Sequence, residues 1–248
     1  MTPNACILPR MSADAAWKVL PHGPLVQLEE NLWTVTGDFP IPFNPLKRVM
    51  TVVKRSDGSL VLHGLIALEE SAQRELESLG EIGHLVAPSG YHRLDAARYK
   101  ARYPKARLYA PKGGRARVEK RAKVDATYEE YAPDETTALE SVDGLADREG
   151  ALVVRSARGV TYVMNDAIFN MPEQSGLSGF VLANVTQSTG GPRVSRTARI
   201  GLLADRARYR AALEKIAATE ALVRVIVAHH VPIEGDVAAA LRAVASTV

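Results

Sequence analysis

The stretch Val160–Asn170 reads Val-Thr-Tyr-Val-Met-Asn-Asp-Ala-Ile-Phe-Asn and predicts a strand that ends at a carboxylate. β-Branched and aromatic residues lead into Asn165 and Asp166, and apolar residues resume at Ala167. A strand interior disfavours aspartate, whereas a strand end tolerates it and can present it to a cleft. The alternative is a turn carboxylate that caps its own backbone, which is common for Asn-Asp pairs.

Three other apolar runs also end near histidine, and together they strengthen the functional interpretation. Val223–Ala228 predicts an apolar strand, and His229 and His230 follow it directly. His63 ends an earlier apolar run, and His92 lies a few residues after another. Metal sites commonly collect imidazole and carboxylate groups from several strand ends, because rigid elements hold the ligands in geometry.

Composition predicts an ordinary globular protein. The 248 residues suffice for one large domain or two small ones, and 46% hydrophobic and 24% charged residues imply a sizeable core. No apolar run approaches the roughly 20 residues of a membrane span, and no secretory signal is visible at the N-terminus. The single cysteine, Cys6, excludes an internal disulfide and a thiolate metal cluster, and it predicts a reducing cytoplasm.

The net charge of +3 is small, but the charges are unevenly distributed. Basic residues crowd the segment 100–123, and acidic residues dominate the following segment, 125–149. A basic block of this kind can bind phosphates. Two oppositely charged surface segments that neutralise one another are the more common arrangement, and we favour that interpretation.

Turn residues and apolar periodicity divide the chain into an N-terminal arm, residues 1–24, and a single domain, residues 25–248. Strands are predicted over Asn31–Thr36, Val49–Arg55, Ser59–His63, Ile82–Ala87, Arg107–Ala110, Leu139–Val142, Ala151–Arg155, Val160–Met164 and Val223–Ala228. Helices are predicted over Ala13–Leu20, Leu68–Leu79, Leu94–Tyr103, Ala116–Lys123, Asp205–Leu222 and Val237–Ser246. Gln174–Ser195, rich in small polar residues, is predicted to be a long loop.

The order of these elements predicts the fold class. Hairpins mix with strand–helix units in both halves of the chain, and Asp57-Gly58 between two apolar runs is a strong hairpin signal. Such an arrangement favours two mixed sheets packed face to face beneath helices. We therefore predict an α/β protein (α+β by some schemes) that forms a four-layer αββα sandwich.

This order of strand ends resembles the metallo-β-lactamase superfamily, in a poorly characterised branch with a degenerate metal-binding motif. Leu60–Gly64 lies where the family has a strand ending in Asp-Thr-Gly, and Leu85–Pro88 lies where a strand leads into His-x-His-x-Asp-His. Tyr162–Asp166 matches the strand whose terminal aspartate bridges the metals. Val225–His229 matches the strand ending in Gly-His-Gly, with His230 in place of the second glycine.

The chain departs from the family pattern in its histidine motif. Ser89–Leu94 reads Ser-Gly-Tyr-His-Arg-Leu, so only His92 can serve, with a shift of one residue. The family's middle histidine has no counterpart near Leu108–Pro111. The resemblance therefore implies one divalent metal, zinc by preference, held by His92, Asp166 and His229, and three protein ligands plus a water form the catalytic pattern. Other residues expected near this site are His63, His230, Asn165 and Tyr91.

Three functions stay open from the sequence. The first is a hydrolase of a small molecule with a single-metal site, in which Asp166 and His229 are ligands and His92 is a third ligand or a proton carrier. The second is a protein of the same fold that has lost metal and binds a small ligand or a partner beneath the loops Gln174–Ser195 and Phe39–Pro45. The third, well behind, is nucleic-acid binding through residues 100–123, which would weaken steeply with salt. No membrane association is expected, and neither substrate nor oligomeric state follows from the sequence.

Overall fold

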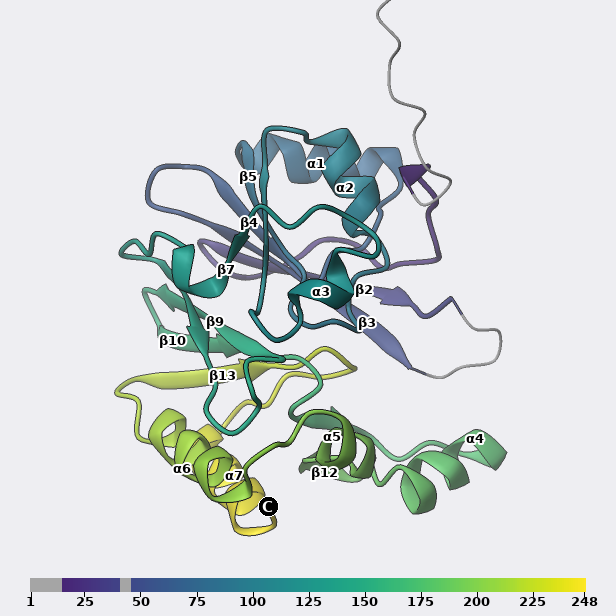
Figure 1. The fold of residues 1–248 in the computed structure, drawn as a ribbon, viewed down its shortest axis with the longest axis vertical. Helices are drawn as coiled ribbons and strands as arrows, with labels where there is room; N and C mark the ends of the chain where they lie inside the picture. The colour runs from purple at the N-terminus through teal and green to yellow at the C-terminus, as the bar shows by residue number, and fades with distance from the viewer. Residues whose placement is uncertain (1–14, 41–45) are drawn as a thin grey trace, which may run out of the picture.

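The computed structural model describes residues 15–40 and 46–248, in which two β-sheets lie stacked between helices (Figure 1). The first sheet follows the chain order: β1 (Val26–Glu29), β2 (Leu32–Asp38), β3 (Lys47–Lys54), β4 (Leu60–His63), β5 (Ile82–Val86), β6 (Arg107–Ala110) and β7 (Ala126–Thr127). Strands β1 to β4 pair antiparallel, and β4 to β7 pair parallel. The carboxyl ends of β4 and β5 therefore share one edge of this sheet.

The second sheet has the order β13-β10-β9-β8. Its strands are β8 (Thr137–Ser141), β9 (Gly150–Ser156), β10 (Gly159–Val163) and β13 (Leu222–Ile226). Only β10 and β13 pair parallel, so the segments that follow these two strands emerge side by side. A separate two-stranded ribbon, β11 (Phe169–Met171) with β12 (Gly191–Arg193), continues from the loop after β10.

Helices cover the outer face of each sheet, as Figure 1 shows. Helices α1 (Glu70–Leu79) and α2 (Ala96–Arg102) pack on the first sheet, while α6 (Arg206–Ala217) and α7 (Val237–Ser246) pack on the second. A third apolar cluster joins the two sheets: Leu32, Val53, Val61, Val86, Leu152, Val154, Val163 and Ile226. Three cores between four layers confirm the predicted αββα architecture.

Aspartate side chains cap the two long helices of the C-terminal half. The Asp205 carboxylate accepts a hydrogen bond from the Arg208 amide at 3.0 Å, which caps α6. Asp236 caps α7 in the same way, through the Ala239 amide at 2.9 Å. Four residues of α6 are buried: Tyr209, Leu213, Ile216 and Ala217. The helix ends at Ala217, however, and Leu222 already belongs to β13.

The predicted loop Gln174–Ser195 is wrong, because the segment contains regular structure. It forms α4 (Gly176–Phe180), a π-helical turn (Val181–Val185) and then β12. Leu177 and Phe180 are 81% and 61% exposed. A helix that buries no apolar stripe leaves no periodic signal in the sequence, which explains the error.

Smaller elements differ from prediction in similar ways. The predicted helix Ala116–Lys123 is a single turn, α3 (Arg115–Val118). Elements that lie outside the predicted strand and helix ranges include β1, β7, β11, β12, the 3₁₀ turn Tyr128–Glu130 and α5 (Arg196–Gly201). Each is short, and each is stabilised by neighbours in the fold rather than by its own residue pattern.

The described part of the N-terminal arm lies against the first helical layer. The Trp17 indole donates to the Leu68 carbonyl at 2.9 Å, and the Arg98 guanidinium donates to the Ala16 carbonyl at 2.8 Å. The helix predicted over Ala13–Leu20 begins outside the described residues, and residues 17–20 form neither helix nor strand. Cys6 and most of the loop Phe39–Pro45 also lie outside the described residues. The division between an arm, residues 1–24, and a domain, residues 25–248, stays a prediction.

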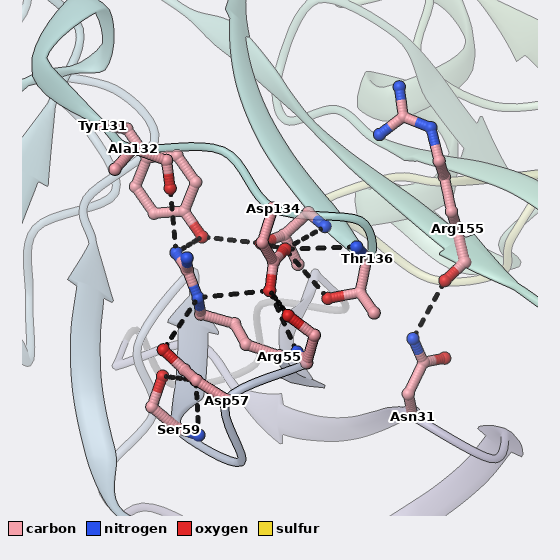
Figure 2. A network of polar contacts seen from close by, with 11 residues as sticks. Asn31, Arg55, Asp57, Ser59, Tyr131, Ala132, Asp134, Thr136 and Arg155 are labelled. Atoms are coloured by element: carbon pink, nitrogen blue, oxygen red, sulfur yellow. Dashed lines mark hydrogen bonds and ion pairs between the residues drawn. The ribbon is translucent and has the colours of Figure 1, made fainter.

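A polar network fixes the far end of β3 to the segment before β8 (Figure 2). The Asp134 carboxylate accepts hydrogen bonds from amide and hydroxyl groups of Ser56, Thr136 and Thr137. The Arg55 guanidinium lies 3.5 Å from the same carboxylate and donates to the Tyr131 hydroxyl at 2.7 Å. The network thus joins the two sheets at the end of β3 that points away from His63.

The basic segment 100–123 is partly neutralised. Lys100 pairs with Asp125 at 2.6 Å, while Arg102 pairs with Glu70 of α1 at 3.0 Å and Arg115 pairs with Glu119. The expected neutralisation therefore comes mainly from α1 and from within the segment, and less from residues 125–149. Within residues 15–40 and 46–248, none of the helices combines the length and apolar character needed to cross a bilayer.

Candidate metal centre

Three strand ends bring His92, Asp166 and His229 together. His92 Nε2 lies 3.0 Å and His229 Nε2 lies 3.1 Å from the same Asp166 oxygen, Oδ1. One potential ligand atom from each residue lies within 4.8 Å of the other two. Asp166 and His229 follow β10 and β13 of the second sheet, whereas His92 follows β5 of the first. The cluster therefore exists only where the two sheets meet.

The backbone of β3 fixes the orientation of His229. His229 Nδ1 lies 2.6 Å from the Lys47 carbonyl oxygen, so Nδ1 must carry the proton and donate. The imidazole then turns Nε2 towards Asp166. Phe169 stacks on the ring, with 5.3 Å between centroids, and prevents it from rotating. A carbonyl that holds the outer nitrogen is the usual support of a metal-binding histidine.

A buried carboxylate, Glu149, holds the loop that carries Asp166. Its two oxygens accept hydrogen bonds from three consecutive amides, those of Asn165 and Asp166 at 2.9 Å and that of Ala167 at 3.0 Å. Glu149 is 0% exposed. These amides have left the strand ladder, and without an acceptor each would cost about 1–3 kcal/mol of desolvation. Glu149 thereby sets the direction in which Asp166 leaves β10.

The pKa values of the two carboxyl groups, Glu149 and Asp166, are shifted in opposite directions. Burial, and then the Asp166 charge, raises the pKa of Glu149 to about 8, although its amide bonds oppose this. Burial also acts to raise the pKa of Asp166, but the charge of His92 and the hydrogen bond from His229 outweigh it and hold that pKa well below its usual value. For His229, burial lowers the pKa, and the bond to Asp166 reverses this and raises it. Asp166 is therefore ionised at neutral pH.

The donor set fits one divalent cation. Two imidazoles and a carboxylate are ligands that zinc accepts, and a fourth position would stay open for a reactant. Loss of a proton from His229 Nε2 exposes a lone pair towards Asp166, because Nδ1 stays bound to the Lys47 carbonyl. Without a cation, the same atoms satisfy one another by direct hydrogen bonds. The chemistry of these residues thus suits a metal ion.

A cavity of about 500 Å³ opens over the cluster, a volume typical of small-molecule sites. Asp166, His92 and His229 all line it. Its apolar lining comprises Phe39, Pro40, Leu46, Leu65, Leu94, Phe169, Ala198 and Leu202. Three arginines also line it: Arg48, Arg93 and Arg121. The cavity therefore suits a molecule with an apolar body and polar substituents.

The other predicted site residues lie around the cluster rather than in it. Tyr91 lines the cavity and is 56% exposed. Asn165 is buried, and its side-chain amide nitrogen, Nδ2, lies 3.3 Å from the Ser89 hydroxyl oxygen. His63 is 2% exposed, its Nε2 has no hydrogen-bond partner among the described residues, and burial, then the His92 charge, lowers its pKa to about 3.

His230 does not join the cluster either, and its backbone conformation is unusual for histidine. It has a φ of +67°, in the left-handed region. Glycine adopts this conformation without cost, whereas a side chain strains it. The glycine of the family's Gly-His-Gly therefore matches a conformation that this chain reaches with histidine.

Some supporting groups gave no signal in the sequence. Glu149 lay in an acidic segment that we interpreted as a surface. The Lys47 carbonyl is backbone and has no residue-type signature at all. The Ser89 hydroxyl accepts hydrogen bonds from the amides of Tyr91 and His92 at 3.2 and 3.3 Å, which shapes the turn that carries His92. A serine placed three residues before a site histidine was the one available hint.

Comparison with solved structures shows that this is the metallo-β-lactamase fold. A metallo-β-lactamase from Erythrobacter litoralis matches with a TM-score of 0.60 and 14% identity over 90% of this chain and 96% of that one. A mono-zinc form of a metallo-β-lactamase from Pseudomonas aeruginosa matches with a TM-score of 0.59 and 13% identity, over 93% of this chain and 97% of that one. A metallo-β-lactamase from Pontibacter korlensis matches with a TM-score of 0.56 and 10% identity, over 90% of this chain and 99% of that one. No protein-family model and no curated protein matches the sequence. The predicted fold is confirmed.

Proposed function

Because the chain has the metallo-β-lactamase fold, we propose that it is a metal-dependent hydrolase of a small molecule with a reduced, single-metal site. His92, Asp166 and His229 would hold the ion, with zinc the first choice. The observation that carries the proposal is the meeting of these three donors at the base of a cavity, with His229 already oriented by the Lys47 carbonyl. One of the similar structures is itself a mono-zinc form.

When bound, the ion would act as a Lewis acid and supply a nucleophilic water near neutral pH. The chain's own residues would do the rest. Asp166, kept ionised by its neighbours, would supply the negative charge that retains a cation. Glu149 would hold the Asp166 loop, and the apolar cavity wall would exclude bulk water from the reacting group.

Zinc titration of chelator-stripped protein tests the proposal. We expect one equivalent to bind, and we expect hydrolysis of a chromogenic ester or a chromogenic β-lactam to appear with that equivalent and disappear on chelation. The matched control is His22→Ala, a histidine that lies outside the cavity, which should bind zinc as the wild type does. Protein that binds no zinc at pH 7.5 would refute the metal site.

The second candidate is a binding protein of the same fold that has lost metal. The direct contacts of Asp166 with both histidines, at 3.0 and 3.1 Å, favour it, since the three residues satisfy one another without an ion. Their closeness is what an ion also requires. Zinc binding with an exchangeable fourth ligand would eliminate this candidate.

Nucleic acid is not the partner that we propose. Lys100, Arg102 and Arg115 of the basic segment already pair with carboxylates, which leaves fewer cations for phosphates. A test for retention on immobilised DNA and RNA at low salt would reveal any such binding. The compartment that we propose is the cytoplasm, on the strength of the single cysteine.

A further inference from the structure

One wall of the cavity is cationic. Arg93 and Arg121 line it, and Arg117 adjoins them: the Arg93 guanidinium donates to the Arg117 carbonyl, and the Arg117 guanidinium lies 4.4 Å from the centre of the Tyr91 ring. Tyr91 also lines the cavity. The wall therefore consists of two segments far apart in sequence, the turn after β5 and the region of α3.

Arg48, also in the lining, is already bound by a carboxylate. It is 6% exposed and pairs with the buried Asp95 at 2.8 Å, and Asp95 also pairs with Arg98. Its role is to hold β3 against the start of α2. Arg48 is therefore engaged by a carboxylate, whereas Arg93 has no carboxylate partner among the residues that the structure describes.

Within residues 15–40 and 46–248, neither Arg93 nor Arg117 forms an ion pair with a carboxylate. A guanidinium held in a partly desolvated place without a carboxylate raises the free energy of the protein until an anion neutralises it. A guanidinium also presents a planar fork that matches the two oxygens of a carboxylate or a phosphate.

We propose that the molecule acted on carries an oxyanion, a carboxylate or a phosphate, that binds to Arg93, and an apolar body that lies on Phe39, Leu65 and Leu202. This inference rests on the proposed function for its catalytic meaning, but the anion site itself does not need a metal. Binding at this wall places the body of the molecule between the arginines and the Asp166 cluster. It would therefore fix which bond faces the three donors.

Calorimetric titration with benzoate and phenyl phosphate, and with benzyl alcohol as the neutral counterpart, tests the site at constant ionic strength. We expect one or both anions to bind to chelator-stripped protein, and benzyl alcohol to bind at least tenfold more weakly. Arg93→Gln should weaken anion binding about tenfold, the effect of one charge-assisted hydrogen-bond pair. Arg93→Lys keeps the charge but loses the planar fork of the guanidinium, so its anion affinity should lie between those of the wild type and Arg93→Gln. Lys120→Gln removes one positive charge from the same region outside the cavity, and should change affinity less than twofold.

The outcomes separate this site from the metal site. Anion binding that persists in stripped protein and in Asp166→Asn, and that falls in Arg93→Gln, supports the anion site whether or not zinc binds. Anion binding that requires zinc overturns it, because the ion would then be the anion's partner. Equal binding of benzyl alcohol and benzoate, or equal loss in Arg93→Gln and Lys120→Gln, also overturns it. Benzoate without phenyl phosphate, or the reverse, identifies the class of oxyanion.

Discussion

Strand β3 has a carboxylate cluster near each end, and both clusters hold an aspartate whose pKa lies well below the usual value. At one end is Asp166, beside His92 and His229; at the other is Asp134, shown in Figure 2. Burial opposes ionisation in both cases. Hydrogen bonds from Ser56 and Thr137 overcome it for Asp134, whereas the two imidazoles overcome it for Asp166.

The partners, and not the pKa, distinguish a functional candidate from a structural one. Every partner of Asp134 is an amide, a hydroxyl or Arg55, and these groups cannot exchange the proton that they share for a metal ion. The partners of Asp166 are imidazoles, which can become ligands when they lose a proton. The cavity adjoins Asp166, and Asp134 lines no part of it. A depressed carboxylate pKa therefore indicates function only together with exchangeable partners and open space.

Replacing each aspartate by asparagine should separate the ligand role of Asp166 from the structural role of Asp134 most clearly. Asp166→Asn is expected to weaken zinc binding at least about 100-fold, because it removes the charged ligand, and to change the free energy of unfolding by less than about 1 kcal/mol. Competition with a chromogenic chelator measures the first quantity and urea unfolding the second. A variant that binds zinc as tightly as the wild type would remove Asp166 from the site.

Asp134→Asn should show the reverse. We expect a loss of about 2–3 kcal/mol in the free energy of unfolding, since the amide group faces donors of Ser56, Thr136 and Thr137 that would lose a charged acceptor. Zinc affinity of the folded variant should match that of the wild type. If zinc affinity fell as well, the two ends of β3 would be coupled and the contrast would fail.

A smaller effect is expected at Glu149, which contacts the Asp166 loop but not the cavity. Glu149→Gln keeps the size but gives only one acceptor oxygen to three amides, so zinc affinity should fall about tenfold, as for other losses of an outer partner. Glu29→Gln is the matched control, because Glu29 is also a buried glutamate but pairs with Arg224 at 2.9 Å. The control should lose stability and keep its zinc affinity. Equal zinc affinity in both variants would leave Glu149 a purely structural role.

The smallest effect concerns a histidine without an acid partner. Burial, and then the Arg55 charge, lowers the pKa of His84 to about 4 from 6.5. The unfolded chain takes up the His84 proton at a higher pH than the folded protein does. The contribution of neutral His84 to the free energy of unfolding is therefore complete above pH 6.5 and is lost as pH falls towards 4. His84→Phe keeps the ring beside Tyr109 and should lose less stability over this window, by about 1 kcal/mol or less because His84 is partly exposed. Urea midpoints at pH 7.5, 6 and 5 measure the difference, and parallel pH curves would contradict it.

The sequence indicated the ligand candidates because polar residues that follow apolar strands stand out against their surroundings. His92, Asp166 and His229 were found in this way, and the order of the strands around them predicted the fold. Their support could not be found, since the Lys47 carbonyl and Glu149 reach the cluster only through the docking of separate segments. Arg93 gave no signal either, because its importance lies in the neighbouring Arg117 and Arg121. Local pattern identifies what a strand end carries, and tertiary contact decides what surrounds it.

The placement of the three donors on two different sheets has a consequence for how the protein folds. Asp166 and His229 come with the second sheet and His92 comes with the first, while the Val49 amide of β3 binds the Ala228 carbonyl at 2.9 Å. Neither half of the sandwich alone holds a complete set of donors. During refolding, the ability to retain a metal ion would thus emerge only when the two sheets dock. A metal-responsive dye would then report the rate at which the two halves assemble.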